Sequence, residues 1–150
     1  MIRPATPADT EFLARANERM ALETEHKVLA PATIRAGVAR VLAEPQLGRY
    51  FVAEQDGQPA GCLLITYEWS DWRNGLFWWV QSVFVEPAYR GRGIYRSLYQ
   101  HVKQLAAVEG GCCGFRLYVE KDNQRARQTY QRLGMSPTDY LLFEESWPGA

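Results

Sequence analysis

The sequence predicts a single α/β domain built on a mixed sheet. Residues 80–85 form a β-branched and aromatic run, which passes through a glycine-rich turn into apolar positions at helical spacing, Ile94, Leu98 and Val102. A second apolar run, residues 115–119, follows that helix, and a strand-helix-strand segment of this length implies parallel neighbours. The 150 residues, 47% of them hydrophobic, suit one compact domain, which we expect to span residues 1–150.

The N-terminal third predicts a short edge strand and two covering helices. Residues 1–5 are expected at a sheet edge, because the proline among them lacks the N–H that an inner strand donates. Thr6 is followed by a proline and then by Asp9, which is the pattern of a capped helix N-terminus. A second helix is expected to begin near Pro31 and to end before Pro45.

The middle of the chain predicts an antiparallel meander. Residues 50–54 and 60–69 are strand-like runs joined by Asp56-Gly57, which is a strong hairpin signal. A polar turn then leads into a third strand, residues 76–85. This strand is apolar at odd and even positions alike, so we expect both of its faces to be covered.

The C-terminal part predicts a further strand, a helix and a last strand. The helix that starts at Gly93 is ended by a glycine pair, and the strand 115–119 follows. Asp122 or Asn123 is expected to cap the next helix. Residues 139–145 are predicted to complete the sheet.

Composition and charge exclude several classes of function. Seventeen basic residues balance 17 acidic ones, which leaves no global field to attract nucleic acid or an anionic membrane. No apolar run approaches the roughly 18 residues of a membrane span, and the N-terminus carries no signal-like segment. The three cysteines lack metal-ligand spacing, so no metal site is predicted. We therefore expect a cytoplasmic protein without a nucleic-acid or membrane partner.

The turn after the third strand has the composition of an anion-binding loop. Gly91 and Gly93 allow consecutive backbone N–H groups to point at one anion, and the helix that follows adds unsatisfied donors and a positive dipole end. Arg90, Arg92 and Arg96 add positive charge. The spacing fits neither a nucleoside triphosphate loop nor a dinucleotide fingerprint. A phosphorylated cofactor is the expected ligand.

Two motifs in this region resemble a known family. Arg90-Gly91-Arg92-Gly93-Ile94 resembles the Arg/Gln-x-x-Gly-x-Gly/Ala loop of the GNAT family of N-acetyltransferases, with Tyr95 in place of the last small residue. In that family the loop wraps the pyrophosphate of acetyl-coenzyme A (acetyl-CoA). Residues 123–135 resemble the family's Asn-x-x-Ala-x-x-x-Tyr-x-x-x-Gly-Phe segment, and they follow the loop in the family's order.

The resemblance implies the GNAT fold, with a mixed, centrally splayed sheet of six to seven strands and helices on both faces. It also implies acetyl-CoA as the acyl donor, whose pantetheine arm would bond to backbone groups left unpaired by the splay. The cofactor-binding residues that it indicates are Val83, Phe84, Val85, Arg90, Gly91, Arg92, Gly93, Ile94, Tyr95, Arg96 and Asn123.

The resemblance also implies that a tyrosine is the general acid. The general acid for the leaving thiolate in the family corresponds to Tyr130 here, and a phenol with a pKa of about 10 stays protonated at neutral pH. Some members place a carboxylate base where this chain has Gln81, whose amide cannot accept the proton. The base therefore stays open among Glu25, Glu68, Asp71, Glu120 and water.

The expected acceptor is a primary amine of a small molecule, such as a polyamine, a diamine or an amino-acid-like compound. Residues 67–79 are similar to the diamine and polyamine acetyltransferase branch, and tryptophans beside carboxylates suit an alkylammonium group. A protein or peptide acetyltransferase, an aminoglycoside acceptor and a non-catalytic acyl-CoA sensor remain alternatives. Exposed aromatics also suggest a homodimer. The residues expected to contact the substrate are Glu25, Glu68, Asp71, Trp72 and Gln81.

Overall fold

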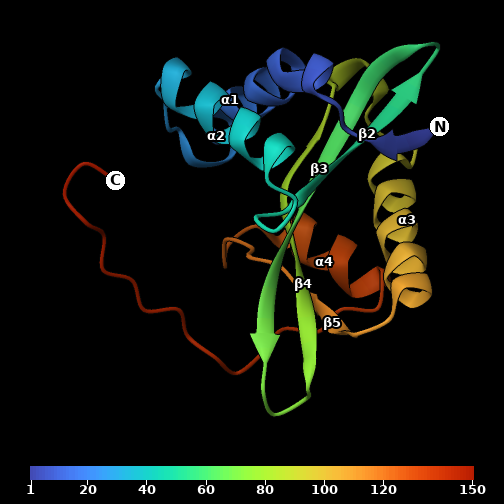
Figure 1. Ribbon diagram of the computed structural model, residues 1–150, viewed down its shortest axis with the longest axis vertical. Coiled ribbons are helices and arrows are strands. Elements are labelled where there is room, and N and C mark those ends of the chain that lie inside the picture. Colours follow the sequence, from blue (N-terminus) through green and yellow to red (C-terminus); the bar gives the residue numbers. More distant parts are fainter. The chain divides into compact units, whose positions relative to one another are not determined.

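The computed structural model describes residues 1–150 and contains one mixed five-stranded sheet (Figure 1). The strands are arranged in the order β1-β2-β3-β4-β5, with antiparallel pairs from β1 to β4 and a parallel pair between β4 and β5. Their bounds are Ile2–Pro4 for β1, Arg49–Gln55 for β2, Gln58–Ser70 for β3, Gly75–Val85 for β4 and Cys112–Arg116 for β5.

Four α-helices accompany the sheet, and the chain forms two compact units. Met1–Tyr118 contains the whole sheet and three helices, and Val119–Ala150 contains the fourth. No helix has the length and apolar character that a membrane span requires. The helices are α1 (Thr10–Glu25), α2 (Pro31–Ala43), α3 (Ile94–Glu109) and α4 (Gln124–Arg132), with short 3-10 turns at Pro7–Asp9 and Pro87–Tyr89.

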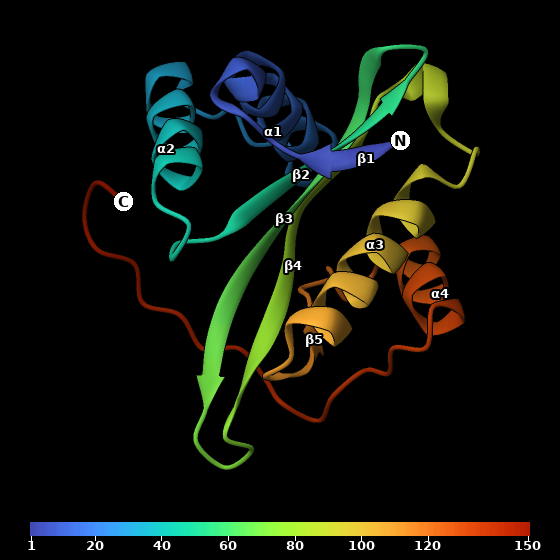
Figure 2. The ribbon, with the colours of Figure 1, turned by 45° about the vertical axis from the view of Figure 1, so that its right-hand side comes forward.

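The helices of the first unit cover both faces of the sheet, as predicted. Figure 2 shows α1 and α2 on one side and α3 on the other. The alternation along β2 explains this: Val52 belongs to the core cluster formed with α1 and α2, whereas Phe51 meets the ring of His101 on α3 at 5.4 Å between centroids. Leu98 and Val102, which the helical spacing predicted to face inward, are fully buried.

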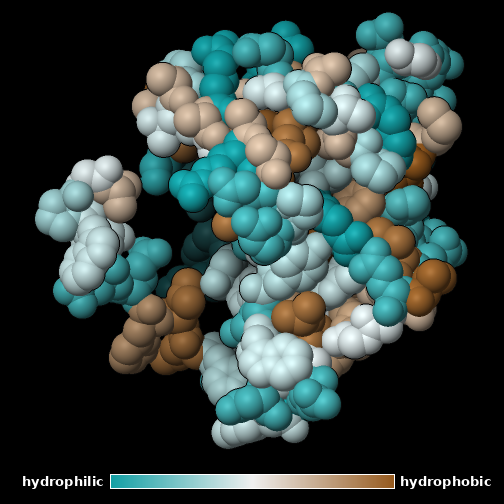
Figure 3. All heavy atoms as spheres, in the orientation of Figure 1, coloured by the Kyte–Doolittle hydropathy of each residue, from teal (hydrophilic) through white to brown (hydrophobic).

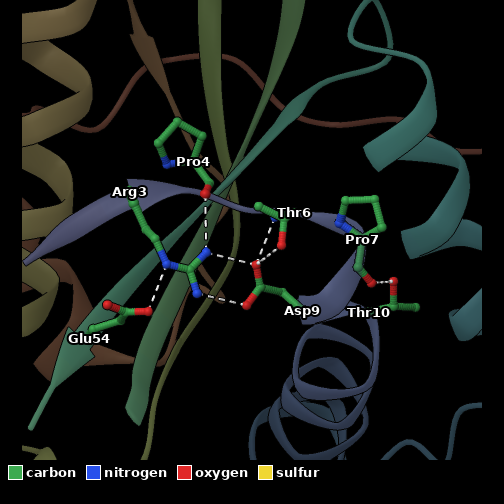
Figure 4. A network of polar contacts seen from close by, with 7 residues as sticks. All are labelled: Arg3, Pro4, Thr6, Pro7, Asp9, Thr10 and Glu54. Atoms are coloured by element: carbon green, nitrogen blue, oxygen red, sulfur yellow. Dashed lines mark hydrogen bonds and ion pairs between the residues drawn. The ribbon is translucent and has the colours of Figure 1, made fainter. Parts of the chain in front are cut away.

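A polar network fixes the start of α1 against the sheet edge (Figure 4). The carboxylate of Asp9 accepts hydrogen bonds of 2.8 and 2.9 Å from Arg3 and one of 2.7 Å from the backbone N–H of Thr6. Arg3 also donates to Glu54 at 2.7 Å. The predicted cap at Thr6 is confirmed, although it opens a 3-10 turn that runs into α1 at Thr10. The network joins β1, β2 and the helix that covers them.

The predicted number of strands is not confirmed, because residues 139–145 form no strand. Leu141 and Phe143 are 85% and 89% exposed, and Figure 3 shows hydrophobic side chains at the surface of this segment. An apolar run becomes a strand only where a neighbouring backbone accepts its hydrogen bonds, and the sequence pattern does not report that partner. The strand expected at 115–119 lies earlier, at Cys112–Arg116, where its register with β4 places it.

Candidate active site

The sheet opens between its two parallel strands. β4 pairs with β5 from Leu76 opposite Cys112 to Trp79 opposite Arg116, and the pairing stops there. β4 continues to Val85, while β5 ends at Arg116. Over residues 80–85, β4 therefore has a ladder partner on its β3 side alone. Alternate backbone groups of this stretch face the opening and can bond to an amide-bearing ligand.

A β-bulge bends β4 within the open stretch. Leu64 pairs with Gln81 and Cys62 pairs with Phe84, so two residues of β4 stand opposite one residue of β3. Ser82, inside the bulge, has a φ of 48°, which lies in the left-handed region that residues other than glycine seldom adopt. Strained backbone of this kind is concentrated at functional sites. The bulge turns backbone groups of Ser82 and its neighbour out of the regular ladder.

The open stretch leads through the 3-10 turn Pro87–Tyr89 into the predicted anion-binding loop. Gly91 and Gly93 each have a φ of 77°, and a Cβ added at either position would meet no atom within 4 Å. The backbone there is thus exposed to a ligand. Ser97 makes the first backbone bond of α3, to the carbonyl of Gly93, so the N–H groups at the helix start have no carbonyl partner within the helix. The residues present fit a diphosphate group.

Arg90 and Arg92 contact the protein itself. Arg90 Nε donates to the carbonyl of Val85 at 2.9 Å, and Arg90 Nη2 pairs with Glu23 at 2.8 Å. The guanidinium of Arg92 lies 5.5 Å from the ring centroid of Tyr89. These contacts with other residues of the protein stabilise the conformation of the loop. Direct contact of the two arginines with a phosphate stays a prediction.

Two ion pairs tie α1 to the segment that carries the loop. Arg19 pairs with Glu86 at 2.7 Å, and Glu23, one turn later on α1, pairs with Arg90 at 2.8 Å. Both guanidinium groups also lie over the ring of Phe84, at 5.2 and 5.7 Å from its centroid. Phe84 itself is 4% exposed and belongs to the core beneath α1. The helix, the end of β4 and the loop are therefore held as one assembly.

Tyr95, which replaces the small residue of the family loop, packs along α3. Its ring stacks on that of Tyr99, one turn later, with centroids 6.3 Å apart. Tyr99 meets Phe115 of β5 at 5.7 Å, and Phe115 meets Trp78 of β4 at 5.9 Å. The large side chain is thus part of an aromatic row on the α3 face of the sheet.

Two of the predicted substrate residues lie on the opposite face, which is the one that α1 and α2 cover in part. Gln81 Nε2 donates to Thr66 Oγ1 at 2.5 Å across β3 and β4. Glu68 Oε1 accepts hydrogen bonds from Arg116 at 2.5 Å and from the indole of Trp79 at 3.3 Å. The strand register places Glu68, Trp79, Gln81 and Arg116 on one side of the sheet.

The other predicted substrate residues lie elsewhere. Asp71 and Trp72 occupy the turn between β3 and β4, where Asp71 Oδ1 accepts from the backbone N–H of Trp72 at 2.9 Å. Trp72 is 87% exposed. Glu25 is the last residue of α1 and is exposed. Glu68 and Gln81 thus share one face of the sheet, whereas these three residues lie in a turn and at a helix end.

The predicted general acid and one predicted cofactor ligand belong to the second unit. Asn123, one of the two residues predicted as the cap, caps α4, since its Oδ1 accepts a hydrogen bond from the N–H of Ala126 at 3.1 Å. Tyr130 lies on α4 and is half-buried, and burial raises the pKa of its phenol above the ordinary value. The roles of Asn123 and Tyr130 at the loop stay predictions.

Three residues of this region were missed by sequence reasoning. The bulge at Ser82 could not be predicted, because a serine inside an apolar strand does not indicate a bulge. Glu23 lies at an acidic helix end, whose composition is equally typical of a solvated surface. Arg116 lies inside an apolar run. The charge of Arg116 in that run was the one signal available, since a charged side chain in a buried strand needs a partner.

Comparison with known proteins agrees with these features. Residues 13–135 match the acetyltransferase (GNAT) family. The thialysine N-epsilon-acetyltransferase of Bos taurus is 32% identical over 96 residues, which cover 61% of this chain and 54% of that protein. The chain thus spans about half the length of the curated relatives it matches.

Solved structures give the same fold. A possible acetyltransferase from Clostridium difficile 630 superposes with a TM-score of 0.92 and 38% identity, covering 98% of this chain and 97% of that one. A structure from Clostridium acetobutylicum, described as a "predicted acetyltransferase with acetyl-CoA", has a TM-score of 0.80 at 20% identity and covers 97% and 95% of the two chains. The matched range contains both motifs and the open stretch of β4. The chain therefore belongs to the acetyltransferase (GNAT) family.

Proposed function

We propose that this protein is an acetyl-CoA-dependent N-acetyltransferase whose acceptor is a primary amine of a small molecule. One observation carries the proposal. The stretch of β4 without a partner on the β5 side is followed by a loop with two left-handed glycines at the start of α3. An extended amide-bearing arm and a diphosphate are attached to each other in coenzyme A, and the open strand and the loop would bind them in the same order.

The loop and helix start would hold the diphosphate. Backbone N–H groups between Gly91 and Arg96 would donate to its oxygens, and the α3 dipole favours the negative charge. Arg96 adds a positive side chain on the first turn of α3. Backbone groups of residues 83–85 would bond to the amides of the arm.

The bound donor supplies an activated thioester. The amine nitrogen attacks the carbonyl carbon, the C–N bond forms and the C–S bond breaks, and the products are an amide and the free thiol. A backbone N–H near the Ser82 bulge would stabilise the charge that develops on the carbonyl oxygen. Tyr130 would donate a proton to the leaving sulfur, and the amine would lose its proton to water or to a carboxylate.

A small amine is the acceptor that the relatives favour. The matched proteins of cattle, pig and mouse are named for acetylation at the ε-nitrogen of thialysine. The rings of Trp79 and Tyr118 and the carboxylate of Glu68 lie together where β4 and β5 begin to separate. An alkylammonium group would bind there.

The test is amine-dependent release of free thiol from acetyl-CoA. The purified chain is assayed with a panel of diamines, amino acids and peptides, and the acetylated product is identified by mass. Turnover with small amines at rates above those for peptides is the expected result. Binding of acetyl-CoA without turnover of any amine would indicate a sensor module instead.

A further inference from the structure

A cluster of charged and aromatic side chains lies where β4 and β5 begin to separate, on the face of the sheet opposite α3. We call Glu68, Phe77, Trp79, Arg116 and Tyr118 the vertex cluster. Trp79 and Arg116 are the last pair between β4 and β5, so the cluster marks the point where the strands part. Trp79 packs against Tyr118 with ring centroids 4.5 Å apart and donates a hydrogen bond to Glu68.

Arg116 is held in one orientation by the protein. Its guanidinium lies 3.7 Å from the ring centroid of Phe77, and its Nη1 pairs with Glu68. Phe77 is fixed in turn by Gly114, because a Cβ at position 114 would come within 2.8 Å of the ring. A side chain that normally loses much rotamer freedom on binding is thus already ordered.

Arg116 still has hydrogen-bonding capacity. A guanidinium carries five N–H donors, and here a single hydrogen bond, from Nη1 to Glu68, is made to the protein. The side chain is 28% exposed, so its remaining edge can reach a ligand. A planar, fixed donor edge of this kind matches a carboxylate.

A diamine lacks a group that Arg116 could bind. Arg73, in the turn between β3 and β4, also lies over Phe77, at 5.0 Å from the ring centroid, and Asp71 lies in the same turn. Arg116 pairs with the carboxylate of Glu68. A diamine would bring two ammonium groups to this pair and no anionic group for the free donors of Arg116. An acceptor that carries both an ammonium and a carboxylate would be complementary to Glu68 and Arg116 side by side.

We infer that Arg116 binds the carboxylate of the acceptor and Glu68 its α-ammonium group. The acceptor class is then an amino acid with an amine at the end of its side chain, and not a simple diamine or polyamine. Arg116 determines specificity in this assignment, while Phe77 positions it. The inference rests on the proposed acetyltransferase function and narrows its substrate.

Two matched pairs of amines test the inference directly. Lysine and 1,5-diaminopentane differ only in the carboxylate, as do ornithine and 1,4-diaminobutane. We expect the native chain to favour the amino acid of each pair in kcat/KM. Arg116→Gln should lower kcat/KM for the amino acids about tenfold to a hundredfold, mainly through KM, which is the effect of losing a charge-assisted bond. The diamines should be unaffected or improved.

Two further variants separate recognition from folding. Arg116→Lys keeps the charge and loses the planar edge, so an intermediate loss on the amino acids is expected. Arg73→Gln removes a positive charge and a contact with the same ring, and it should leave the preference within each pair unchanged. Thermal unfolding of every variant confirms that it is folded.

Binding of the same amines to the coenzyme A complex is measured by calorimetry. A native chain that binds or acetylates the diamines better than the amino acids would overturn the inference, as would equal losses on both members of a pair in Arg116→Gln. No binding of the amino acids to the complex would overturn it as well. Failure of coenzyme A itself to bind would instead remove the proposed function.

Discussion

Arg90 and Glu23 form an ion pair of 2.8 Å between the anion-binding loop and the last turns of α1. Arg90 also donates to the carbonyl of Val85, so one guanidinium joins the helix, the end of β4 and the loop. The loop is therefore positioned by the N-terminal part of the chain as well as by its own glycines.

Glu23→Gln should weaken coenzyme A binding by releasing the loop from α1. Because both side chains are more than two-fifths exposed, we expect a modest increase in Kd, about twofold to fivefold. Calorimetric titration measures it. Glu11→Gln is the matched control, since it removes an exposed ion pair with Arg35 from the start of the same helix. An equal change in both variants would contradict the role given to Arg90.

Ser82 should tolerate glycine better than a β-branched residue. At a φ of 48°, valine is strained, whereas glycine adopts this conformation readily. Ser82→Val is expected to lower the free energy of unfolding by about 1 to 3 kcal/mol and to reduce kcat more than Ser82→Gly does. Denaturant unfolding and steady-state kinetics check the two effects. Equal stability and activity of the variants would show that the bulge is not strained.

Tyr130→Phe should slow turnover and leave cofactor affinity unchanged. Loss of a general acid costs on the order of a hundredfold in kcat. Burial raises the pKa of Tyr130, so the phenol stays protonated through neutral and mildly alkaline pH, and its donor function is lost only above the ordinary value of about 10. Single-turnover rates across pH measure this. An unchanged kcat would assign the proton to another donor.

Asp9 should make the fold sensitive to acid. Hydrogen bonds from Arg3, chiefly, and from Thr6 hold the pKa of Asp9 below its ordinary value of 3.8. A lowered pKa contributes stability that is fully present above the unfolded value and is lost as the pH falls toward the folded one. Asp9→Asn should lower the free energy of unfolding at pH 7 by about 1 to 3 kcal/mol. It should also flatten the decline in stability below pH 4, which urea unfolding at several pH values detects.

Local signals in the sequence predicted local structure well. The cap at Thr6, the Asp56-Gly57 turn with both residues at positive φ, and the cap at Asn123 are all confirmed. Each depends on neighbouring residues alone, so a single sequence contains the information. The family motifs, which are equally local, indicated the family correctly.

Contacts between residues far apart in the chain could not be predicted from the sequence. Arg116 and Glu68 are 48 positions apart and meet because two strands flank β4. The bulge at Ser82 depends on the register with β3, and the strand expected at 139–145 lacked a ladder partner. No local pattern encodes these pairings. The homodimer and the cytoplasmic location stay predictions.

The most direct test of the account is a calorimetric titration of the native chain and of Gly93→Val with coenzyme A. Gly93 has a φ of 77°, so valine should distort the loop and block the approach of the diphosphate. We predict saturable heat with one site per chain for the native protein and a large loss of affinity in the folded variant. No saturable heat with the native chain would contradict the central claim that this loop and the open edge of β4 bind the cofactor.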